Sequence, residues 1–158
     1  MKTLLRIVEG ISVVLIFALI GARIMGFNPK GPRPGLWLSG SLVTSPVKDW
    51  SFVDNYPTIE VQTNSWYLIP HSVTIWCVSY QNNLYLQAFG RTWKQNIARD
   101  PHVRIKIGNQ LYDRTVSPIT DTSEFSGVAQ NMTKKYPSWK PLKPSEIDLG
   151  IFLRIANN

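Results

Sequence analysis

PHSVTIWCVSYQNNLYLQAFGRTWKQNIARDPHVRIKI, residues 70–107, is the stretch of the chain that decides its fold. Two apolar runs, Ser72–Tyr80 and Leu84–Ala88, lie on either side of the polar segment Gln81–Asn83. Asparagine tolerates the left-handed backbone that a tight turn between two strands requires. The stretch therefore predicts a β-hairpin.

A basic segment, Arg91–Arg99, follows the hairpin and is predicted to be a short helix that ends at Asp100-Pro101. The next run, His102–Ile107, alternates apolar and basic residues, which is the period of a half-buried strand. The alternation places three side chains on the buried face: Val103, Ile105 and Ile107. Hairpin, short helix and strand form the central unit of the predicted fold.

On the amino-terminal side, Leu36–Thr44 and Thr58–Thr63 read as strands, and Asn64–Ile69 can begin a further strand before Pro70 interrupts it. Between the first two lies the aromatic-rich segment Val47–Pro57, which we interpret as a structured loop.

On the carboxyl-terminal side, Leu111–Ile119 is predicted to be a strand that pairs back on His102–Ile107. Asp121 and Glu124 then form a capping box that opens a helix running to about Tyr136. A proline-rich loop leads to the closing strand, Ile147–Ile155. Short strands joined by tight turns, without a strand–helix rhythm, favour a mainly β fold with some α: an antiparallel barrel of about seven strands, one short helix and one longer helix.

The first residues are of another kind, because the segment 4–25 is apolar between charged ends. Its length just reaches the roughly 20 residues that a bilayer-spanning helix needs, with the terminal charges snorkelling to the interfaces. A cleavable signal peptide is the alternative, although Gly21-Ala22-Arg23 offers no clear small-x-small cleavage site. We expect an uncleaved single-pass membrane anchor. Basic residues flank both ends, so the side of the membrane stays open.

Asn28–Gly35 is rich in proline and glycine, which predicts a stiff spacer. The expected organisation is an anchor over residues 1–26, a spacer over 27–35 and a barrel domain over 36–158.

The formal net charge of +7 suits nucleic acid, anionic lipid or a phosphorylated cofactor, and charge alone does not choose among these partners. A membrane anchor makes nucleic acid an improbable partner. Two distant histidines and one cysteine provide no metal-site spacing. Cys77 lies in an apolar strand pattern, so we interpret it as a buried, inert thiol.

One segment carries a chemical signal, since Arg91, Thr92 and Lys94 cluster where a short helix follows a strand. Amides at a helix start, a hydroxyl and two cations make a phosphate site. A solvated basic turn is the alternative interpretation.

In this order of elements the chain resembles the flavin-binding split β-barrel superfamily, which includes pyridoxamine-phosphate oxidases, flavin reductases and deazaflavin-dependent nitroreductases. The resemblance lies in the hairpin, the Thr-x-Lys turn at Thr92–Lys94, and the Asn-Ile-x-x-Asp-Pro-x-Val run over 96–103. It implies FMN or a deazaflavin as cofactor, no metal, and a homodimer with the cofactor near the interface. If a flavin is bound, the cytoplasmic side of the membrane is favoured.

The resemblance also implies which residues hold the cofactor. The phosphate would be held where the first hairpin strand opens and at the basic turn. Trp66 and Tyr67 could stack on a ring or line a substrate pocket. The implied cofactor-binding residues are His71, Ser72, Arg91, Thr92, Lys94, Trp66 and Tyr67. His71 is a departure, because neutral imidazole is a weaker phosphate clamp than arginine, and a turn histidine is its alternative role.

Two functions follow from these features. The first is a membrane-anchored, FMN- or deazaflavin-binding oxidoreductase that acts on a small or lipid-soluble acceptor. The second is a non-catalytic split barrel, an accessory or assembly subunit of a membrane complex that docks through the anchor, the spacer and the aromatic-rich segment Val47–Pro57. In the second, Trp76 would fill the space of the cofactor ring; the alternative for Trp76 and Trp93 is packing in the core or a dimer interface.

Overall fold

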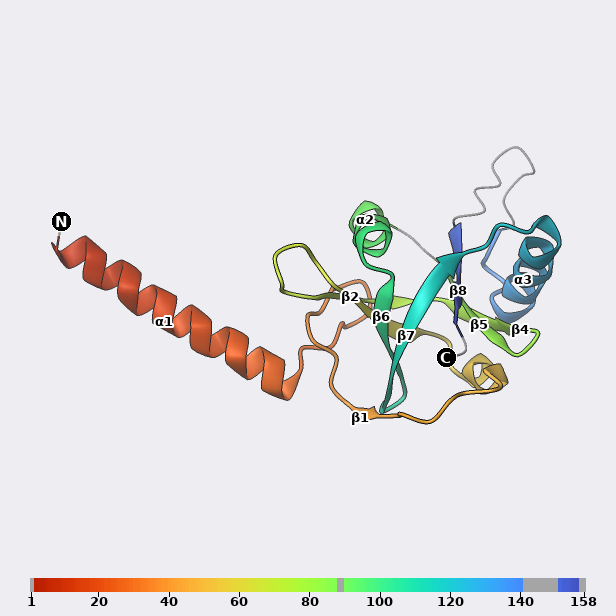
Figure 1. The fold of residues 1–158 in the computed structure, drawn as a ribbon, viewed down its shortest axis with the longest axis horizontal. Coiled ribbons are helices and arrows are strands. Elements are labelled where there is room, and N and C mark those ends of the chain that lie inside the picture. Colours follow the sequence, from red (N-terminus) through yellow and green to blue (C-terminus); the bar gives the residue numbers. More distant parts are fainter. Residues whose placement is uncertain (1, 88–89, 141–150, 157–158) are drawn as a thin grey trace.

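The computed structural model of the protein describes residues 2–87, 90–140 and 151–156, in which one long helix projects from a β-barrel (Figure 1). The described elements are α1 (Lys2–Met25), β1 (Ser41–Leu42), the 3₁₀ helix η1 (Ser51–Asn55), β2 (Ile59–Thr63), β3 (His71–Ile75), β4 (Cys77–Tyr80), β5 (Asn83–Gln87), α2 (Arg91–Arg99), β6 (His102–Ile107), β7 (Gln110–Pro118), α3 (Thr122–Lys135) and β8 (Phe152–Ile155).

The strands form one sheet in the order β3-β2-β6-β7-β8-β5-β4. Neighbours along this path are antiparallel, and β1 adds a short parallel pair to β7. The two ends of the order, β3 and β4, are consecutive in the chain and are separated only by Trp76. The sheet therefore wraps around an interior, and the predicted antiparallel barrel with one short and one longer helix is confirmed.

The central unit differs from the prediction in one respect. Ser72–Tyr80 is not one strand, because the chain changes partner at Trp76: β3 pairs with β2, whereas β4 pairs with β5. Only the second half of the predicted strand belongs to the hairpin. A periodic apolar run cannot reveal this change, since both halves bury alternate side chains in the same interior.

The hairpin turn and the strand after α2 agree with the sequence. Gln81 and Asn82 both have positive φ, 48° and 64°, as a two-residue turn of the hairpin type requires. Helix α2 spans the predicted Arg91–Arg99. In β6 the three apolar side chains are buried at 4% exposure or less, whereas His102, Arg104 and Lys106 are exposed or half-buried.

Two amino-terminal predictions are wrong. The strand expected over Leu36–Thr44 is only the two-residue β1, because Leu38 donates its backbone N–H to the Gln62 side chain instead of a strand partner. Asn64–Ile69 forms a turn rather than a strand, with Leu68 at a φ of 66°. Of the closing strand predicted over Ile147–Ile155, β8 confirms the end; residues 147–150 lie outside the described part, as does most of the proline-rich loop.

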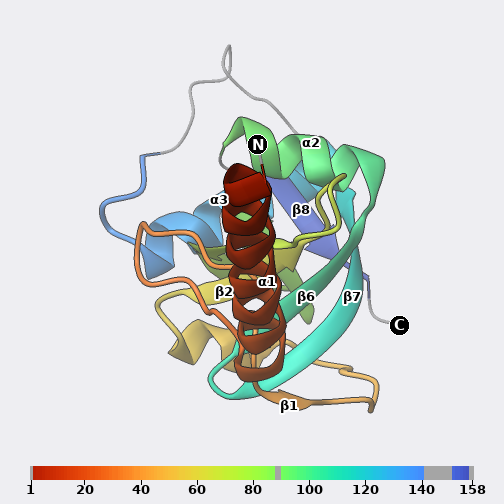
Figure 2. The same ribbon diagram turned by 90° about the vertical axis from the view of Figure 1, so that its left-hand side faces the viewer.

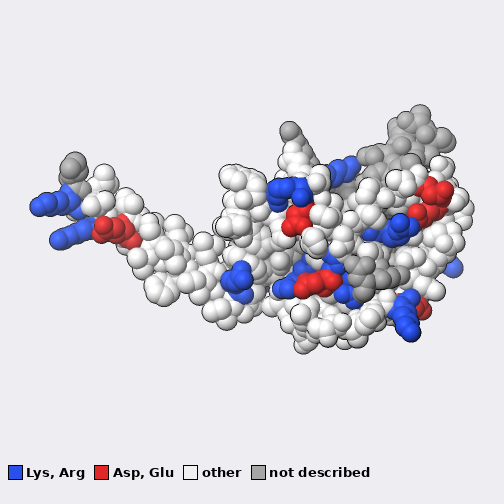
Figure 3. All heavy atoms as spheres, viewed as in Figure 1, with Lys and Arg blue, Asp and Glu red and all other residues white. Residues whose placement is uncertain are grey.

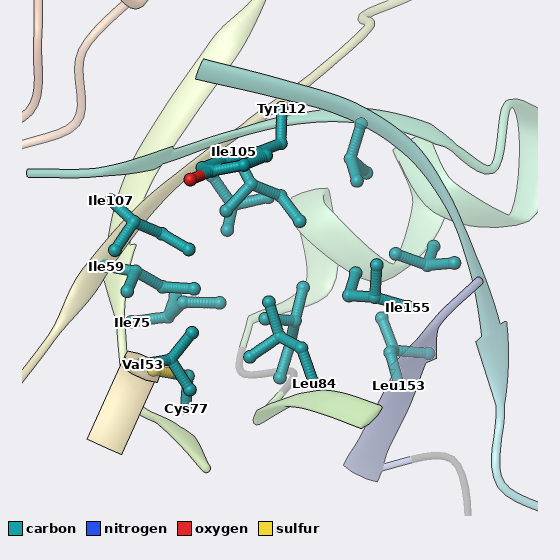
Figure 4. Close-up of a cluster of buried hydrophobic side chains, with 14 of the residues drawn as sticks. Val53, Ile59, Ile75, Cys77, Leu84, Ile105, Ile107, Tyr112, Leu153 and Ile155 are labelled. Atoms are coloured by element: carbon teal, nitrogen blue, oxygen red, sulfur yellow. The ribbon is translucent and has the colours of Figure 1, made fainter. Parts of the chain in front are cut away.

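The barrel interior is filled by apolar side chains from all walls. Figure 4 shows Ile105 and Tyr112 on one side facing Leu84 and Cys77 on the other. The cluster consists of Trp50, Val53, Ile59, Val61, Ile75, Cys77, Leu84, Leu86, Trp93, Val103, Ile105, Ile107, Tyr112, Val116, Leu153 and Ile155. Burial of a side chain of this size contributes roughly 1.5–3 kcal/mol, so this interior is the main source of stability.

A second cluster lies between the barrel and α3. Asp121 caps this helix as predicted, its carboxylate accepting from the Glu124 N–H at 2.7 Å. Phe125, Val128 and Met132 are buried against the sheet, which confirms the predicted apolar face. Gly127 allows the close approach of Tyr80, because a Cβ at Gly127 would lie 2.3 Å from the Tyr80 ring.

Side chains at the end of α3 hold the backbone at Trp76 and Cys77, where the chain passes from β3 to β4. The Tyr136 hydroxyl accepts from the Cys77 N–H at 3.2 Å and lies 2.9 Å from the carbonyl oxygens of Cys77 and Pro57. The Lys135 ammonium donates to the carbonyls of Cys77 at 2.9 Å and Val53 at 3.0 Å. Trp76 stacks on the Tyr136 ring, with centroids 4.9 Å apart. The end of α3 thereby holds the backbone at Val53, Pro57 and Cys77 in place.

Helix α1 is apolar and has no residue buried against the barrel. Among the described residues it is the one helix long and apolar enough to cross a bilayer, a property that membrane anchors and signal sequences share. Lys2, Arg6 and Glu9 lie near its amino-terminal end and Arg23 lies in its last turn, with an uncharged stretch between them, whereas the barrel surface carries both signs (Figure 3).

After α1 the chain turns back on itself. Phe27 donates its N–H to Trp37, and Leu36 donates to Phe27. Gly35 and Ser72 exchange two backbone hydrogen bonds, of 2.8 and 3.0 Å. The proline- and glycine-rich segment is thus joined at its end to the outer edge of β3, while its expected role as a spacer stays a prediction.

We predict that Lys135→Met lowers the free energy of unfolding by about 1–3 kcal/mol, because the carbonyl oxygens of Cys77 and Val53 each lose a charged hydrogen-bond donor. Its neighbour Lys134 is exposed, so Lys134→Met is the matched control and should change stability by less than about 0.5 kcal/mol. Chemical denaturation of the detergent-purified chain, followed by tryptophan fluorescence, measures both. Equal effects of the two variants would contradict the role given to the Lys135 ammonium.

Candidate functional site

The start of α2 is an open, basic site. Gly90 precedes the helix with a φ of 92°, a conformation that side chains disfavour, and a Cβ there would meet nothing within 4 Å. Among the described residues, no side-chain hydrogen bond caps the first turn. Helix-start amides without a capping side chain attract anions, and a hydroxyl and cations beside them strengthen the site. The geometry therefore suits a phosphate or another small anion.

Helix α2 has two different faces. Trp93 is 2% exposed in the barrel interior and Asn96 is 4% exposed, which fixes the inner face. Thr92 and Lys94 are exposed on the outer face, close to the amino-terminal end of the helix. The Arg91 backbone opens the helix, and its side chain lies outside the described structure. Of the two interpretations of Trp93, core packing is correct.

The inner face connects α2 to the opening of β3. The Asn96 amide donates to the Thr63 hydroxyl at 3.1 Å, and this hydroxyl donates to the His71 carbonyl at 3.2 Å. Thr63 is fully buried and pairs with His71 across β2 and β3. Sequence reasoning did not identify Thr63 as part of this region. Asn96 belongs to the Asn-Ile-x-x-Asp-Pro run, so the sequence already pointed to this residue. Its hydrogen bond with Thr63 could not be predicted from the sequence.

His71 is half-buried, and its Nδ1 has no hydrogen-bond partner among the described residues. Burial lowers the pKa of the imidazole below its ordinary value of 6.5. The side chain is therefore neutral at pH 7 and cannot act as a cationic clamp.

Ser72 is completely buried beneath the segment that ends at Gly35. A Cβ on Gly35 would lie 2.6 Å from the Ser72 hydroxyl oxygen, so the two backbones are in close contact. The hydroxyl oxygen has no hydrogen-bond partner among the described residues. The chain itself covers Ser72, and this hydroxyl does not face solvent.

The predicted site residues do not form one cluster. The opening of β3 meets α2 at Asn96, five residues after Arg91, which corresponds to about 7.5 Å along a helix. Further contacts agree, since Asn64 bonds to Asp100 at 2.7 Å, beyond the carboxyl-terminal end of α2. The basic turn and the strand opening thus lie toward opposite ends of α2.

Trp66 and Tyr67 lie at the tip of the β2–β3 loop, where they are 78% and 49% exposed. Their rings touch edge to face, with centroids 5.4 Å apart. This contact joins the two rings to each other and does not involve the start of α2. Their role against a ring or substrate therefore stays a prediction.

A polar hollow of about 690 Å³ lies over β2, β6 and β7, beside the end of α1. Its most ordered charged pair is Arg104 and Asp113, joined by two hydrogen bonds of 2.7 and 2.8 Å. The lining residues are Arg23, Trp37, Leu38, Gln62, Asn64, Leu68, Pro70, His102, Val103, Arg104, Asp113, Arg114 and Thr115. A second hollow, of about 490 Å³, separates the segment 31–34 from the edge of β3.

Other reactive groups are inert or absent in the described residues. Burial raises the pKa of the Cys77 thiol to about 11, which confirms that this cysteine is not a reactive thiolate. No group of three metal-ligating side chains is found in the described part. Trp50 and Val53 of the segment Val47–Pro57 are buried in the interior, so the core of this segment is unavailable as the docking surface that the second function expected.

At the level of sequence, no family model and no curated protein matches the chain. At the level of structure, an F420-H2 dependent reductase matches with a TM-score of 0.50 and 16% identity, covering 64% of this chain and 95% of its own. The chain has the split-barrel fold.

Two further split-barrel structures agree. The heme storage protein HutZ from Vibrio cholerae matches with a TM-score of 0.52 and 14% identity over 68% of this chain and 86% of its own. A protein described as a domain-swapped dimer matches with a TM-score of 0.53 and 16% identity over 64% and 81%. The three matches cover between 81% and 95% of the neighbours' own chains.

We predict that Asn96→Ala lowers the free energy of unfolding by about 1–3 kcal/mol, because the buried Thr63 hydroxyl loses its donor. Gln95→Ala removes an exposed amide from the same helix and is the matched control, with an expected change under about 0.5 kcal/mol. Denaturant unfolding of the full chain in detergent measures the difference. If both variants unfold alike, the Thr63–Asn96 contact does not hold α2 to the barrel.

We predict that stability falls as the pH is lowered through about 6.5, the ordinary pKa of histidine. The folded state keeps His71 neutral, so the unfolded chain binds the proton first, and the stabilisation present above this pH is lost below it. Unfolding of the parent and of His71→Asn, measured between neutral and mildly acidic pH, isolates the contribution. An identical pH dependence in the two proteins would contradict this assignment.

Proposed function

We propose that the protein is a membrane-attached split-barrel oxidoreductase that binds FMN or a deazaflavin, with the cofactor phosphate at the start of α2. The split-barrel fold supports the cofactor class, since one neighbour is an F420-H2 dependent reductase. The observation that carries the proposal is the open, uncapped helix start with Gly90 in its positive-φ conformation. Such a start accepts the phosphate group that FMN and deazaflavin cofactors share.

Of the two parts of the expected phosphate site, the start of α2 fits this cofactor and the start of β3 does not. At α2 the exposed Thr92 hydroxyl and the helix amides are suited to donate to phosphate oxygens, and the exposed Lys94 adds positive charge. At β3 the expected second half does not fit, because His71 is neutral and Ser72 is covered by the chain. We therefore assign phosphate binding to α2 alone.

A bound flavin or deazaflavin would supply the hydride chemistry, which no group of protein side chains provides here. The described residues contribute binding: the α2 amides and the Thr92 hydroxyl orient the anion. The polar hollow beside the end of α1 is the candidate space for the acceptor, because Arg23 of the membrane helix contributes to its lining.

We assign membrane attachment to α1, since the helix is long, apolar and unburied. An anchored barrel meets acceptors that dissolve in the bilayer, which is why we propose a small or lipid-soluble acceptor. The family resemblance further suggests a homodimer, and a neighbour described as a domain-swapped dimer supports pairing of such barrels. The barrel of a flavin-dependent enzyme would lie on the cytoplasmic side.

The proposal is tested by an absorbance spectrum of the detergent-purified chain and by titration with FMN, riboflavin and a phosphate-bearing deazaflavin. We predict that FMN binds at least tenfold more tightly than riboflavin, because only FMN offers a phosphate. Thr92→Ala should weaken FMN binding about tenfold, equal to about 1.4 kcal/mol, and leave riboflavin binding unchanged.

Gln95→Ala, one residue beyond Lys94 on the same exposed turn, is the control and should leave both affinities unchanged. A colourless protein that takes up none of the three compounds would rule out the oxidoreductase. Equal affinities for FMN and riboflavin would contradict the assignment of phosphate binding to α2.

A second function, a non-catalytic accessory or assembly subunit of a membrane complex, is favoured by one observation. The Gly35 segment seals Ser72 and the edge of β3, where the resemblance places half of the cofactor site. A barrel that has lost its cofactor would be expected to close this edge. Co-purification with a larger membrane assembly, together with absent cofactor uptake, would establish this function in place of the first.

A further inference from the structure

The tip of the β2–β3 loop displays three consecutive large apolar side chains. Trp66, Tyr67 and Leu68 are 78%, 49% and 89% exposed. Elsewhere in the described barrel the exposed large apolar residues Phe27, Leu42 and Tyr56 stand singly. Contiguous exposed apolar side chains mark a surface that another apolar phase covers.

This tip is held in place by its base. The Ser65 hydroxyl donates to the Ile69 carbonyl, and the Leu68 N–H donates back to the Ser65 carbonyl at 3.4 Å, which closes the turn. Arg99 and Asp100 of the α2 end bond the backbone and side chain of Asn64. The three side chains therefore lie on a turn whose base is held by hydrogen bonds.

The backbone of Leu68 is a second indication that the surrounding structure imposes this turn, since its φ is 66°. A branched, bulky side chain rarely occupies the left-handed region, and such conformations persist where the surrounding structure imposes them, often at functional surfaces. Here the conformation turns the most exposed leucine of the barrel outward.

The tip lies on the side of the barrel from which α1 departs. In Figure 1 the loop between β2 and β3 projects toward the side from which α1 departs, and Figure 2 looks onto this side of the barrel. The same proximity appears in the polar hollow, which Arg23 of α1 and Leu68 of the loop both line. Arg23 also lies 6.0 Å from the centre of the Trp37 ring, at the junction of helix and barrel.

We propose that Trp66, Tyr67 and Leu68 form a second membrane contact, seated in the headgroup–acyl boundary of the leaflet from which α1 emerges. The inference rests on the membrane attachment proposed for α1. Tryptophan and tyrosine favour this boundary because their rings are apolar and their N–H and O–H groups reach water, and leucine extends into the acyl region. Two points of attachment, helix and loop, fix the orientation of the barrel on the membrane.

Charge and size both favour lipid over a protein partner. Arg23 lies at the end of α1 and Arg99 beside the loop base, where both can meet anionic headgroups, whereas Arg104 of the hollow is paired with Asp113. Three side chains of this size offer at most about 600 Å², below the roughly 800 Å² that each partner of a standard protein interface buries. The tip is large enough to enter a bilayer surface and too small for a stable protein interface.

The test uses the full chain in lipid nanodiscs of phosphatidylcholine and phosphatidylglycerol, with a spin label at Trp66→Cys or Leu68→Cys. Gln130→Cys, on the exposed face of α3 at the opposite side of the barrel, is the matched control. The native Cys77 is buried, and labelling of the parent protein gives its background. Collisions of each label with oxygen, which enters lipid, and with a water-soluble nickel chelate report the surroundings.

We expect labels at 66 and 68 to be accessible to oxygen and protected from nickel, with the reverse at 130. Discs that hold the chain but leave 66 and 68 as open to nickel as 130 would overturn the second contact alone and leave the loop to a protein partner. A chain that does not enter the discs at all would overturn both this contact and the membrane attachment by α1.

Discussion

The barrel depends on the point where the chain passes from β3 to β4. β3 pairs with β2 and β4 with β5, so the two ends of the sheet order meet at Trp76 and Cys77. The backbone there is held by the end of α3, where the Tyr136 hydroxyl and the Lys135 ammonium contact the Cys77 peptide groups. Docking of α3 and closure of the barrel are therefore one packing event, which explains why a surface helix contributes to the interior.

Helix α2 packs against the barrel with its inner face and exposes its outer face. Its inner face is committed, since Trp93 fills the interior and Asn96 completes a buried chain of hydrogen bonds to Thr63 and the β3 backbone. Its outer face is exposed, and its start is the anion site that we propose. In the proposed function, this division leaves phosphate binding to α2, while the chain itself closes the edge of β3.

Closure of β3 and attachment to the membrane belong to the same region of the molecule. The segment after α1 pairs with the β3 edge through Gly35, and the α1 end shares a polar hollow with the β2–β3 loop. An edge strand is protected by this pairing, which removes a site of unwanted strand addition. With the membrane attachment proposed for α1, the helix, the sealed edge and the aromatic tip would together place one face of the barrel toward the bilayer.

Local patterns were sufficient for several elements of the fold. The Gln81–Asn83 turn, the α2 bounds, the alternation of β6 and the Asp121 cap each depend on neighbouring residues, so the sequence by itself determined them, and with them the barrel class. The anion site proposed at residues 91–94 was predictable for the same reason, because helix start, hydroxyl and cations are adjacent in the chain.

Contacts between distant residues had to await the tertiary structure. The partner change at Trp76, the two-residue β1, the Thr63–Asn96 bond and the covering of Ser72 by Gly35 all join segments that are far apart, and periodicity carries no information about partners. Trp66 and Tyr67 were recognised as aromatic residues of interest, but only the loop geometry decided that they point into solvent beside α1. The sequence determined which groups the protein carries, and the packing of distant segments decided which of them a ligand or a membrane can reach.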